Sequence, residues 1–150
     1  VDTFESAITW NAFHAFYEGV IQDVGDAIHR VTGRASRISC RLTHVYPDGP
    51  APYFSFSARG REDGDLASAL SMWREIKRAC NEAVIRHGGT STHHHAVGRD
   101  HRSAYEREVP DLMRQALVAA KATLDPAGIM NPGVLFDPAG RTIGVTGALA

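Results

Sequence analysis

Four histidines lie close together in the segment TSTHHHAVGRDH, residues 90–101. On an extended backbone, the side chains of His93 and His95 point to one face of the chain and that of His94 to the other. A pair of histidines at positions i and i+2 can bind zinc, and His101 could supply a third nitrogen. Three interpretations stay open from these residues alone: a metal site, a solvated polar loop, and a polar pocket without a metal.

The charge of such a cluster decides what a polar pocket built from it can do. Neighbouring imidazoles repel one another when protonated, so the cluster favours neutral rings, a shared proton or a bound anion. Apart from Asp100, no acidic residue or cysteine accompanies the histidines in this stretch. The cluster can therefore exchange protons near neutral pH or hold a phosphate, and both abilities serve catalysis.

A second candidate for chemistry is Tyr53, the first residue of the alternating segment YFSFS. Ser55 and Ser57 share its side of this segment, so its phenol need not lie in an apolar layer. A catalytic tyrosine needs its usual pKa, about 10, lowered by positive or hydrogen-bonding groups. The histidines could do this if the fold brings them to Tyr53. The alternative is a packed ring with its hydroxyl at the rim of a sheet.

Helices are predicted on both sides of these candidate residues. Apolar residues at helical spacing predict a helix over residues 10–31, which Gly33 ends, and a second helix over residues 65–87. A third helical region follows the histidines, restarts at Pro110 and continues to residue 124.

Strands are predicted where the hydrophobic period changes to two. Residues 37–45 and 53–59 alternate, and the segment YPDGPAP between them has the composition of a turn, so the two strands form a hairpin. The residues expected on the buried faces of these strands are Ile38, Cys40, Leu42, Phe54 and Phe56. With the histidines on a short extended piece, the predicted order is α-β-β-α-β-α.

This order predicts an α+β fold, an antiparallel sheet with helices packed on one face as in a ferredoxin-like domain. The chain has 150 residues, of which 43% are hydrophobic, enough for one globular domain with a core. A formal net charge of −1 gives no basic bias toward nucleic acid. No apolar run is long enough to span a bilayer, and two cysteines fit a reducing, cytoplasmic compartment. Because the chain opens at Val1 without a methionine, we expect it to be a fragment of a longer protein.

Four segments of the sequence resemble one flavoenzyme family. They are FESAITW (4–10), CRLTHVYPDGPAPYFSF (40–56), GGTSTHHHAVG (88–98) and KATLDPAGIMNPGVL (121–135). In this order and spacing they resemble the C-terminal (cap) domain of FAD-linked oxidases of the vanillyl-alcohol oxidase superfamily. The resemblance covers residues 1–135 and leaves residues 136–150 as a C-terminal tail.

Within that superfamily, the histidine segment is the more discriminating one. Hydroxy-acid dehydrogenases usually carry Glu-His-Gly where this chain has His94, His95 and Ala96. The triple histidine, together with the hairpin that carries Tyr53, is similar to the alkyldihydroxyacetonephosphate synthases of ether-lipid synthesis. The resemblance implies an FAD-dependent exchange of the acyl chain of acyl-dihydroxyacetone phosphate for a long-chain alcohol, through an adduct at the flavin N5 atom.

The resemblance also implies roles for particular residues. Tyr53 falls on the active-site tyrosine, a general acid/base, while His93, His94 and His95 would orient the substrate and move protons. His95 and Asn131 would lie next to the flavin, and no metal is expected. We also expect the FAD-binding domain to lie upstream, so that this piece alone is inactive and binds FAD weakly.

Other partners and functions follow from the same resemblance. A lipid-like phosphate and a fatty alcohol would be the substrates, which suggests peripheral contact with a membrane, and a homodimer stays open. Two alternative functions are weighed against the synthase: an FAD-linked oxidase or dehydrogenase of a small 2-hydroxy acid, and a metal-binding module that uses His93, His95 and His101.

Overall fold

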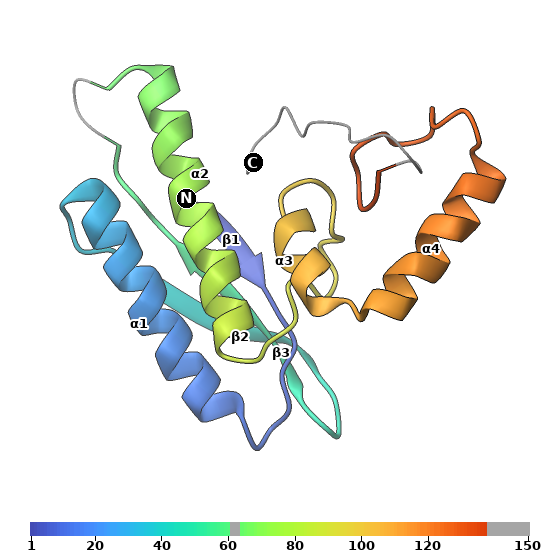
Figure 1. Cartoon of the computed structure of the whole chain (residues 1–150). Coiled ribbons are helices and arrows are strands. Elements are labelled where there is room, and N and C mark those ends of the chain that lie inside the picture. The colour runs from blue at the N-terminus through green and yellow to red at the C-terminus, as the bar shows by residue number, and fades with distance from the viewer. Residues whose placement is uncertain (61–63, 138–150) are drawn as a thin grey trace. The chain divides into compact units, whose positions relative to one another are not determined.

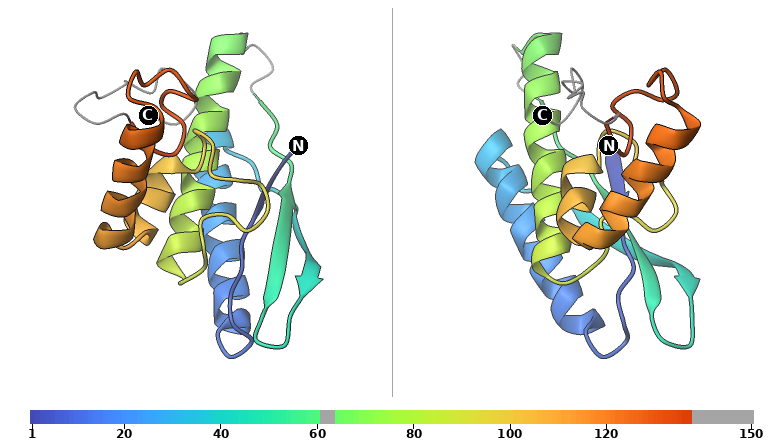
Figure 2. Two further views of the ribbon diagram at one scale, coloured as in Figure 1. Left: turned by 90° about the vertical axis from the view of Figure 1, so that its right-hand side faces the viewer. Right: turned by 45° about the vertical axis from the view of Figure 1, so that its right-hand side comes forward.

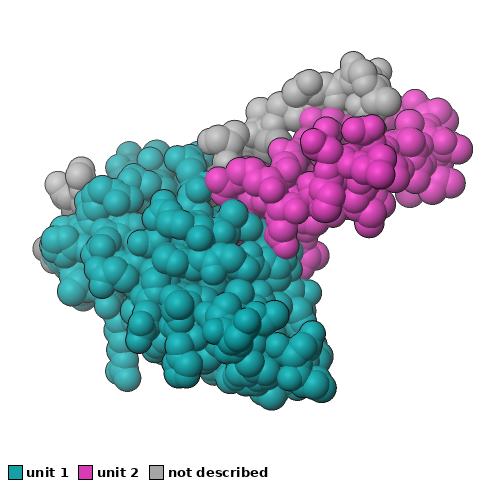
Figure 3. Space-filling view, turned by 60° about the horizontal axis from the view of Figure 1, so that its bottom comes forward, with its two compact units in different colours: residues 1–95 teal, residues 96–150 magenta. Residues whose placement is uncertain are grey.

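The computed structural model of the chain describes residues 1–60 and 64–137 (Figure 1). Its elements are β1 (Asp2–Glu5), α1 (Phe13–Thr32), β2 (Ile38–Val45), β3 (Pro50–Phe56), α2 (Leu66–Arg86), α3 (Arg102–Glu108) and α4 (Asp111–Leu124). The chain divides into two compact units, residues 1–95 and 96–150, which Figure 3 colours separately. The predicted α+β fold is confirmed.

The sheet of the first unit has three antiparallel strands in the order β1-β3-β2. The strand β1 was not predicted, and it pairs with the central strand so that Glu5 lies opposite Tyr53. On the other side, β2 pairs with β3 and places Arg41 opposite Tyr53. The tyrosine therefore lies in the middle of the sheet, between an acidic and a basic neighbour.

Helices α1 and α2 cover one face of this sheet, as predicted (Figure 2). Phe4 of β1 stacks on Phe54 of β3, with 4.8 Å between the ring centroids. Burial of such rings and of the apolar faces of both helices is the main source of stability. The core consists of Phe4, Phe16, Val20, Val24, Ile28, Phe54, Phe56, Ile76, Cys80, Ala83 and Val84.

The limits of both helices follow from local chemistry. Helix α1 ends at Thr32 and is capped by Gly33, whose φ of 70° is left-handed and whose N–H donates to the carbonyl of His29. Helix α2 begins after Asp65, whose carboxylate accepts a hydrogen bond of 2.8 Å from the N–H of Ser68. The predicted helices 10–31 and 65–87 are thus confirmed to within a few residues.

The hairpin departs from the prediction at its turn. The strand β3 begins at Pro50, so the turn is shorter than the segment YPDGPAP, and the N–H of Tyr46 donates to the carbonyl of Gly49. Proline fits here because a register shift interrupts the β2–β3 pairing between Leu42 and His44. Leu42 lies on an outer strand of the sheet and is 39% exposed, against the prediction that it shares the buried face.

The predicted strand at the histidines is wrong, because no strand is assigned between α2 and α3 in residues 87–101. In the second unit, α3 and α4 are separated at Pro110 as predicted. No residue of α4 is buried, so its predicted apolar stripe does not enter a core in the described part of the chain. Among the described helices, none combines the length and apolarity needed to cross a membrane.

Candidate functional site

A single carboxylate oxygen organises the histidine segment. The backbone N–H groups of His93, His94 and His95 donate to Oε1 of Glu5 at 2.7, 2.9 and 2.9 Å. The hydroxyl of Thr92 donates to the same oxygen at 2.8 Å. Three successive N–H groups that converge on one anion form a concave backbone nest, which requires a bend and excludes an extended strand.

Neighbouring contacts hold this bend against the start of the chain. Beyond β1, the N–H of Thr90 donates to the carbonyl of Ala7, and the hydroxyl of Ser6 donates to the carbonyl of Thr90 at 2.8 Å. Gly89 is required at the approach, because a Cβ there would lie 2.5 Å from the ring of Phe16 and from the hydroxyl of Ser6. The histidine segment is therefore anchored on both its glycine and its histidine ends.

Glu5 carries a negative charge beneath the histidines. Its side chain is buried, with 1% exposure. Burial raises the pKa of Glu5, but the hydrogen bonds from the three histidine N–H groups and from Thr92 outweigh it and lower the pKa to about 2. The prediction that only Asp100 could join the histidines therefore missed Glu5, which β1 brings from the other end of the first unit.

The second oxygen of Glu5 faces the imidazoles. Its Oε2 lies 3.2 Å from Nδ1 of His94 and 3.8 Å from Nδ1 of His93. Although these distances are short, the buried Oε2 has no partner within residues 1–60 and 64–137 that meets hydrogen-bond geometry. The carboxylate thus acts in two ways: one oxygen shapes the backbone, and the other directs its charge at two histidine rings.

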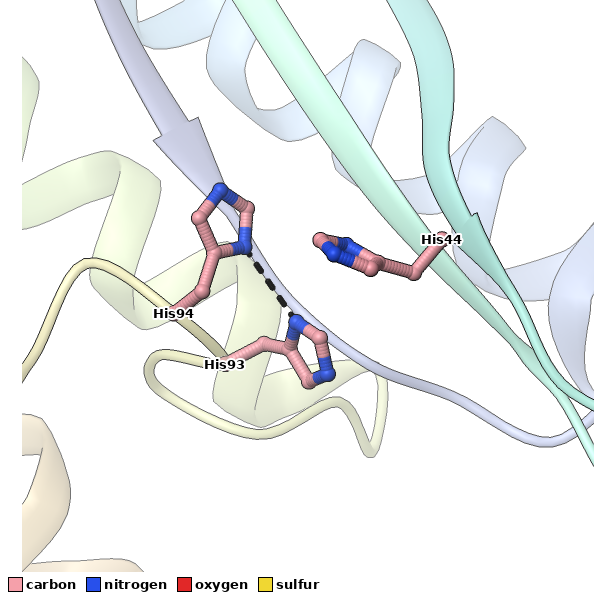
Figure 4. Close-up of side chains that lie close together, drawn as sticks. All are labelled: His44, His93 and His94. Atoms are coloured by element: carbon pink, nitrogen blue, oxygen red, sulfur yellow. Dashed lines mark hydrogen bonds between the residues drawn. The ribbon is translucent and has the colours of Figure 1, made fainter.

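Three imidazoles converge above this charge (Figure 4). The Nδ1 atoms of His93 and His94 are 3.2 Å apart. His44, from β2, contributes a third ring, whose centroid is 5.1 Å from that of His93 and 5.2 Å from that of His94. The grouping predicted for a metal was His93, His95 and His101. The group found in the described residues is instead His44, His93 and His94.

His101, the third residue of the predicted metal set, belongs to the second unit. His101 is buried, with 7% exposure, and precedes α3. Its N–H donates to the carbonyl of Val97, and its own carbonyl accepts from the N–H of Tyr105. These backbone contacts give His101 a place at the start of a helix.

The structure brings Tyr53 to the histidine segment. Its ring stacks on that of His94 with 6.0 Å between centroids, and the ring of His95 meets it edge-on at 5.2 Å. The guanidinium of Arg41 lies 4.7 Å from the centre of the Tyr53 ring. The tyrosine hydroxyl donates to the hydroxyl of Thr3 at 3.1 Å. Tyrosine, imidazole and guanidinium groups therefore meet on the sheet face opposite α1 and α2.

Asn131 lies in the second unit, within the loop that follows α4. Its φ of 47° is left-handed, and it borders an apolar cavity of about 400 Å³. The loop is fixed by Asp125, which accepts hydrogen bonds from the N–H groups of Ile129 and Met130. The hydrogen bond from Lys121 lowers the pKa of Asp125, although burial opposes the shift. The role of Asn131 near a cofactor stays a prediction.

Chemically, the first unit offers an exposed surface that can donate, accept and relay protons. His94 and His95 are exposed, whereas the charge that orients them is buried. Of the residues that build or support this surface, the sequence prediction missed Glu5, Arg41, His44 and Tyr46. The hydroxyl of Tyr46 contacts Nε2 of His93 at 3.2 Å.

Comparisons with known proteins show which sequences the chain resembles. The profile of the C-terminal domain of FAD linked oxidases matches residues 1–135. An alkyldihydroxyacetonephosphate synthase of Trypanosoma brucei brucei is 29% identical over 136 residues, which cover 90% of this chain and 21% of the synthase. The synthase of Dictyostelium discoideum is 30% identical over 99 residues, covering 66% of this chain and 16% of the synthase.

A bacterial protein also matches the chain. An uncharacterised FAD-linked oxidoreductase of Escherichia coli strain K12 is 26% identical over 140 residues, which cover 89% of this chain and 27% of that protein. The chain spans about a fifth of the length of one of these synthases and about a sixth of the other.

Proposed function

The chain belongs to the family of FAD-linked oxidase C-terminal domains, and we propose that it forms one wall of an FAD-dependent active site. The reaction that we assign to the whole protein is the exchange of the acyl chain of acyl-dihydroxyacetone phosphate for a long-chain alcohol. The observation that carries this proposal is the packing of Tyr53 against His94 and His95 on an exposed sheet face. The similarity to two alkyldihydroxyacetonephosphate synthases supports the choice of substrate class.

The residues of this face suit contact with a flavin ring. His94 and His95 are exposed and present flat rings whose nitrogens can hydrogen-bond the polar edge of a flavin. FAD, when bound, supplies a planar and redox-active ring system that the protein must orient. We assign His95 to this contact, and Asn131 to a contact with the cofactor from the second unit. The phosphates of FAD would be held by the part of the protein outside this chain.

The exchange needs a proton acceptor for the alcohol and a proton donor for the leaving group. The bond between the acyl oxygen and the substrate carbon breaks, and the alcohol oxygen forms the new bond to that carbon. The alcohol proton is lost, and the acyl group leaves as a fatty acid, so there is no net redox change. Tyr53 and His95 are in ring contact and can divide these two proton transfers between them.

The same face also fits an anionic substrate. Arg41 carries a permanent positive charge beside Tyr53. The donors on the rings of His93 and His94 lie on the same side of the sheet and can orient a phosphate.

The test uses the full-length protein loaded with FAD. Acyl-dihydroxyacetone phosphate and a radiolabelled fatty alcohol are supplied, and both labelled ether product and released fatty acid are measured. Tyr53→Phe and His95→Ala should each lower turnover by about 100-fold or more. Ser55→Ala, on the same face of β3, is the control and should stay within about twofold of the wild type.

Two results would overturn different parts of the proposal. Full activity in both variants, with native circular dichroism, removes the site assignment. No ether product from the wild type, with reduction of the flavin by a 2-hydroxy acid instead, replaces the synthase with a dehydrogenase and leaves the site in place.

A further inference from the structure

We propose that the outer face of helices α1 and α2 is a two-fold interface between two copies of this chain. This inference goes beyond the proposed function and does not depend on it. A groove of about 440 Å³ runs between the two helices on the side turned away from the sheet (Figure 1). Charged side chains line this groove, and their order along it carries the proposal.

Two ion pairs show which residues of α1 and α2 lie side by side. Nη1 of Arg86 is 2.8 Å from Oδ2 of Asp23 at one end of the groove. Nε of Arg30 is 3.8 Å from Oε1 of Glu75 at the other end. Because α1 advances along the chain from Asp23 to Arg30 while α2 returns from Arg86 to Glu75, the helices run antiparallel. The middle of the groove lies between these two pairs.

The charges in the groove change sign at its middle. Two acidic residues lie toward the Asp23 end, Asp26 of α1 and Glu82 of α2. Two basic residues lie toward the other end, Arg30 of α1 and Arg78 of α2. The groove therefore has an acidic half and a basic half, each built from both helices.

The floor between the two halves is made of small residues. Ala27 of α1 is buried, with 2% exposure, and Ala79 of α2 is half-buried. The distance at which two helices pack depends on the size of the side chains at their contact. Alanine at this level lets a second pair of helices approach closely, so that charges on both sides of the centre come within reach.

A two-fold axis that lies across the groove at the alanines makes the face complementary to itself. Such an axis places each position on one side of the centre opposite the equivalent position on the other side in the second copy. Helix α1 then lies antiparallel to α1 of the partner, and α2 lies antiparallel to α2. Asp26 faces the partner's Arg30, and Glu82 faces the partner's Arg78. Each attraction occurs twice, because the contact is symmetric.

One axis satisfies both helices. The midpoint between Asp26 and Arg30 is residue 28 of α1, and the midpoint between Arg78 and Glu82 is residue 80 of α2. Both midpoints lie between the two ion pairs and at about the same height along the antiparallel helices. Charges spread without order over a solvated face would place like charges opposite one another as often as unlike ones. Complementary charges of this kind fix the partner and the register of an interface.

The size of the face is sufficient for a reversible dimer. Helices α1 and α2 contain 20 and 21 residues. Each is therefore about 30 Å long and about 10 Å wide. Side by side they present about 600 Å² per copy, and a pair that covers this face buries about 1,200 Å², at the lower end of the range for specific interfaces.

Pairing through these helices is compatible with the proposed active-site wall. Tyr53 and the histidine segment lie on the opposite face of the sheet from α1 and α2. The partner would therefore leave the Tyr53 face of the first unit uncovered in both copies.

The experiment measures the mass of the full-length protein with FAD bound, by sedimentation equilibrium over a range of concentrations. We expect a dimer whose dissociation constant rises about tenfold between roughly 0.05 and 0.5 M salt, since exposed ion pairs are screened. Arg78→Glu and Glu82→Arg should each weaken the dimer by about 100-fold, because each places like charges opposite one another twice. Arg37→Glu, an exposed arginine outside the groove, is the matched control and should dimerise like the wild type.

Mixing the two charge-reversal variants separates the interface from effects within one chain. In a mixed pair, Glu at position 78 of one copy faces Arg at position 82 of the other, and the wild-type Glu82 and Arg78 face each other as before. We expect the mixture to form dimers at concentrations where each variant alone is monomeric. Repulsion within each chain is unchanged by mixing, so it cannot produce this result.

Three results would overturn the interface. They are a wild type that stays monomeric at every concentration, a dimer that both charge reversals leave intact, and a mixture of the two variants that stays monomeric. Circular dichroism of each variant verifies that the fold is intact. Each of these results leaves the proposed enzyme function standing, because that function is measured by ether product.

Discussion

Replacing Glu5 by glutamine tests how the histidine segment is held in place. The substitution keeps the shape of the side chain and removes its charge. Oε1 accepts hydrogen bonds from Thr92 and from the N–H groups of three successive histidines, and charge-assisted bonds of this kind are about twice as strong as neutral ones. An amide would keep an acceptor for these donors but would weaken every bond.

The magnitude follows from the pKa of Glu5. The pKa falls from 4.5 to about 2 in the folded chain. At about 1.4 kcal/mol per pKa unit, ionised Glu5 stabilises the folded state by roughly 3 kcal/mol at neutral pH. Because the folded pKa is the lower one, this contribution is complete above the unfolded pKa of 4.5 and is lost as the pH falls toward 2.

The measurement is urea unfolding of wild type and Glu5→Gln, followed by circular dichroism from neutral pH to about pH 3 with a chelator present. We expect a gap in the free energy of unfolding of roughly 3 kcal/mol at neutral pH, which narrows as the pH falls below about 4.5. Glu18→Gln, at an exposed position of α1, is the control and should leave the free energy unchanged. A gap below about 1 kcal/mol at neutral pH, or one that does not vary with pH, would refute the reasoning.

Three further predictions concern other parts of the chain. Gly89→Ala should lower the free energy of unfolding by about 1–3 kcal/mol, because its Cβ would overlap the Phe16 ring; Gly60→Ala, which meets nothing within 4 Å, should be neutral in the same urea titration. Burial raises the pKa of the Cys80 thiol to about 12 and that of the Cys40 thiol to about 11. At about pH 8, both thiols should therefore react slowly with a thiol reagent in the native protein and rapidly in the unfolded protein. Asp125→Ala removes the acceptor of the Ile129 and Met130 N–H groups, and hydrogen exchange at these two amides should become at least about tenfold faster while α1 keeps its protection.

Elements that depend on local pattern could be predicted from the sequence. The stripes of α1 and α2 and the alternation of Phe54 and Phe56 reflect the helical and strand periods directly. The strand β1 was missed because it is four residues long and because a buried glutamate interrupts its apolar character. No local rule says that a glutamate will be buried, since its partners lie 87 to 90 residues away.

The site could be predicted only in part, because some of its residues come together through contacts between distant parts of the sequence. The sequence pointed to Tyr53 and to His93–His95, and the structure brings these groups into ring contact. The sequence also predicted that the histidine side chains alternate between two faces, a prediction that assumed an extended backbone. The nest around Glu5 turns His93 and His94 toward the same point instead, and His44 joins them through a bulge that the period of β2 does not reveal. Long-range pairing of this kind cannot be predicted from residue spacing.

The central claim is that the face with Tyr53 and His95 borders the flavin of the whole protein. The most direct measurement is the visible absorption spectrum of the flavin in full-length protein with FAD bound at one equivalent. We expect His95→Ala and Tyr53→Phe each to shift the flavin bands or change their fine structure, while His29→Ala leaves the spectrum of the wild type. Spectra that are identical in all four proteins, at equal FAD content, would contradict the claim.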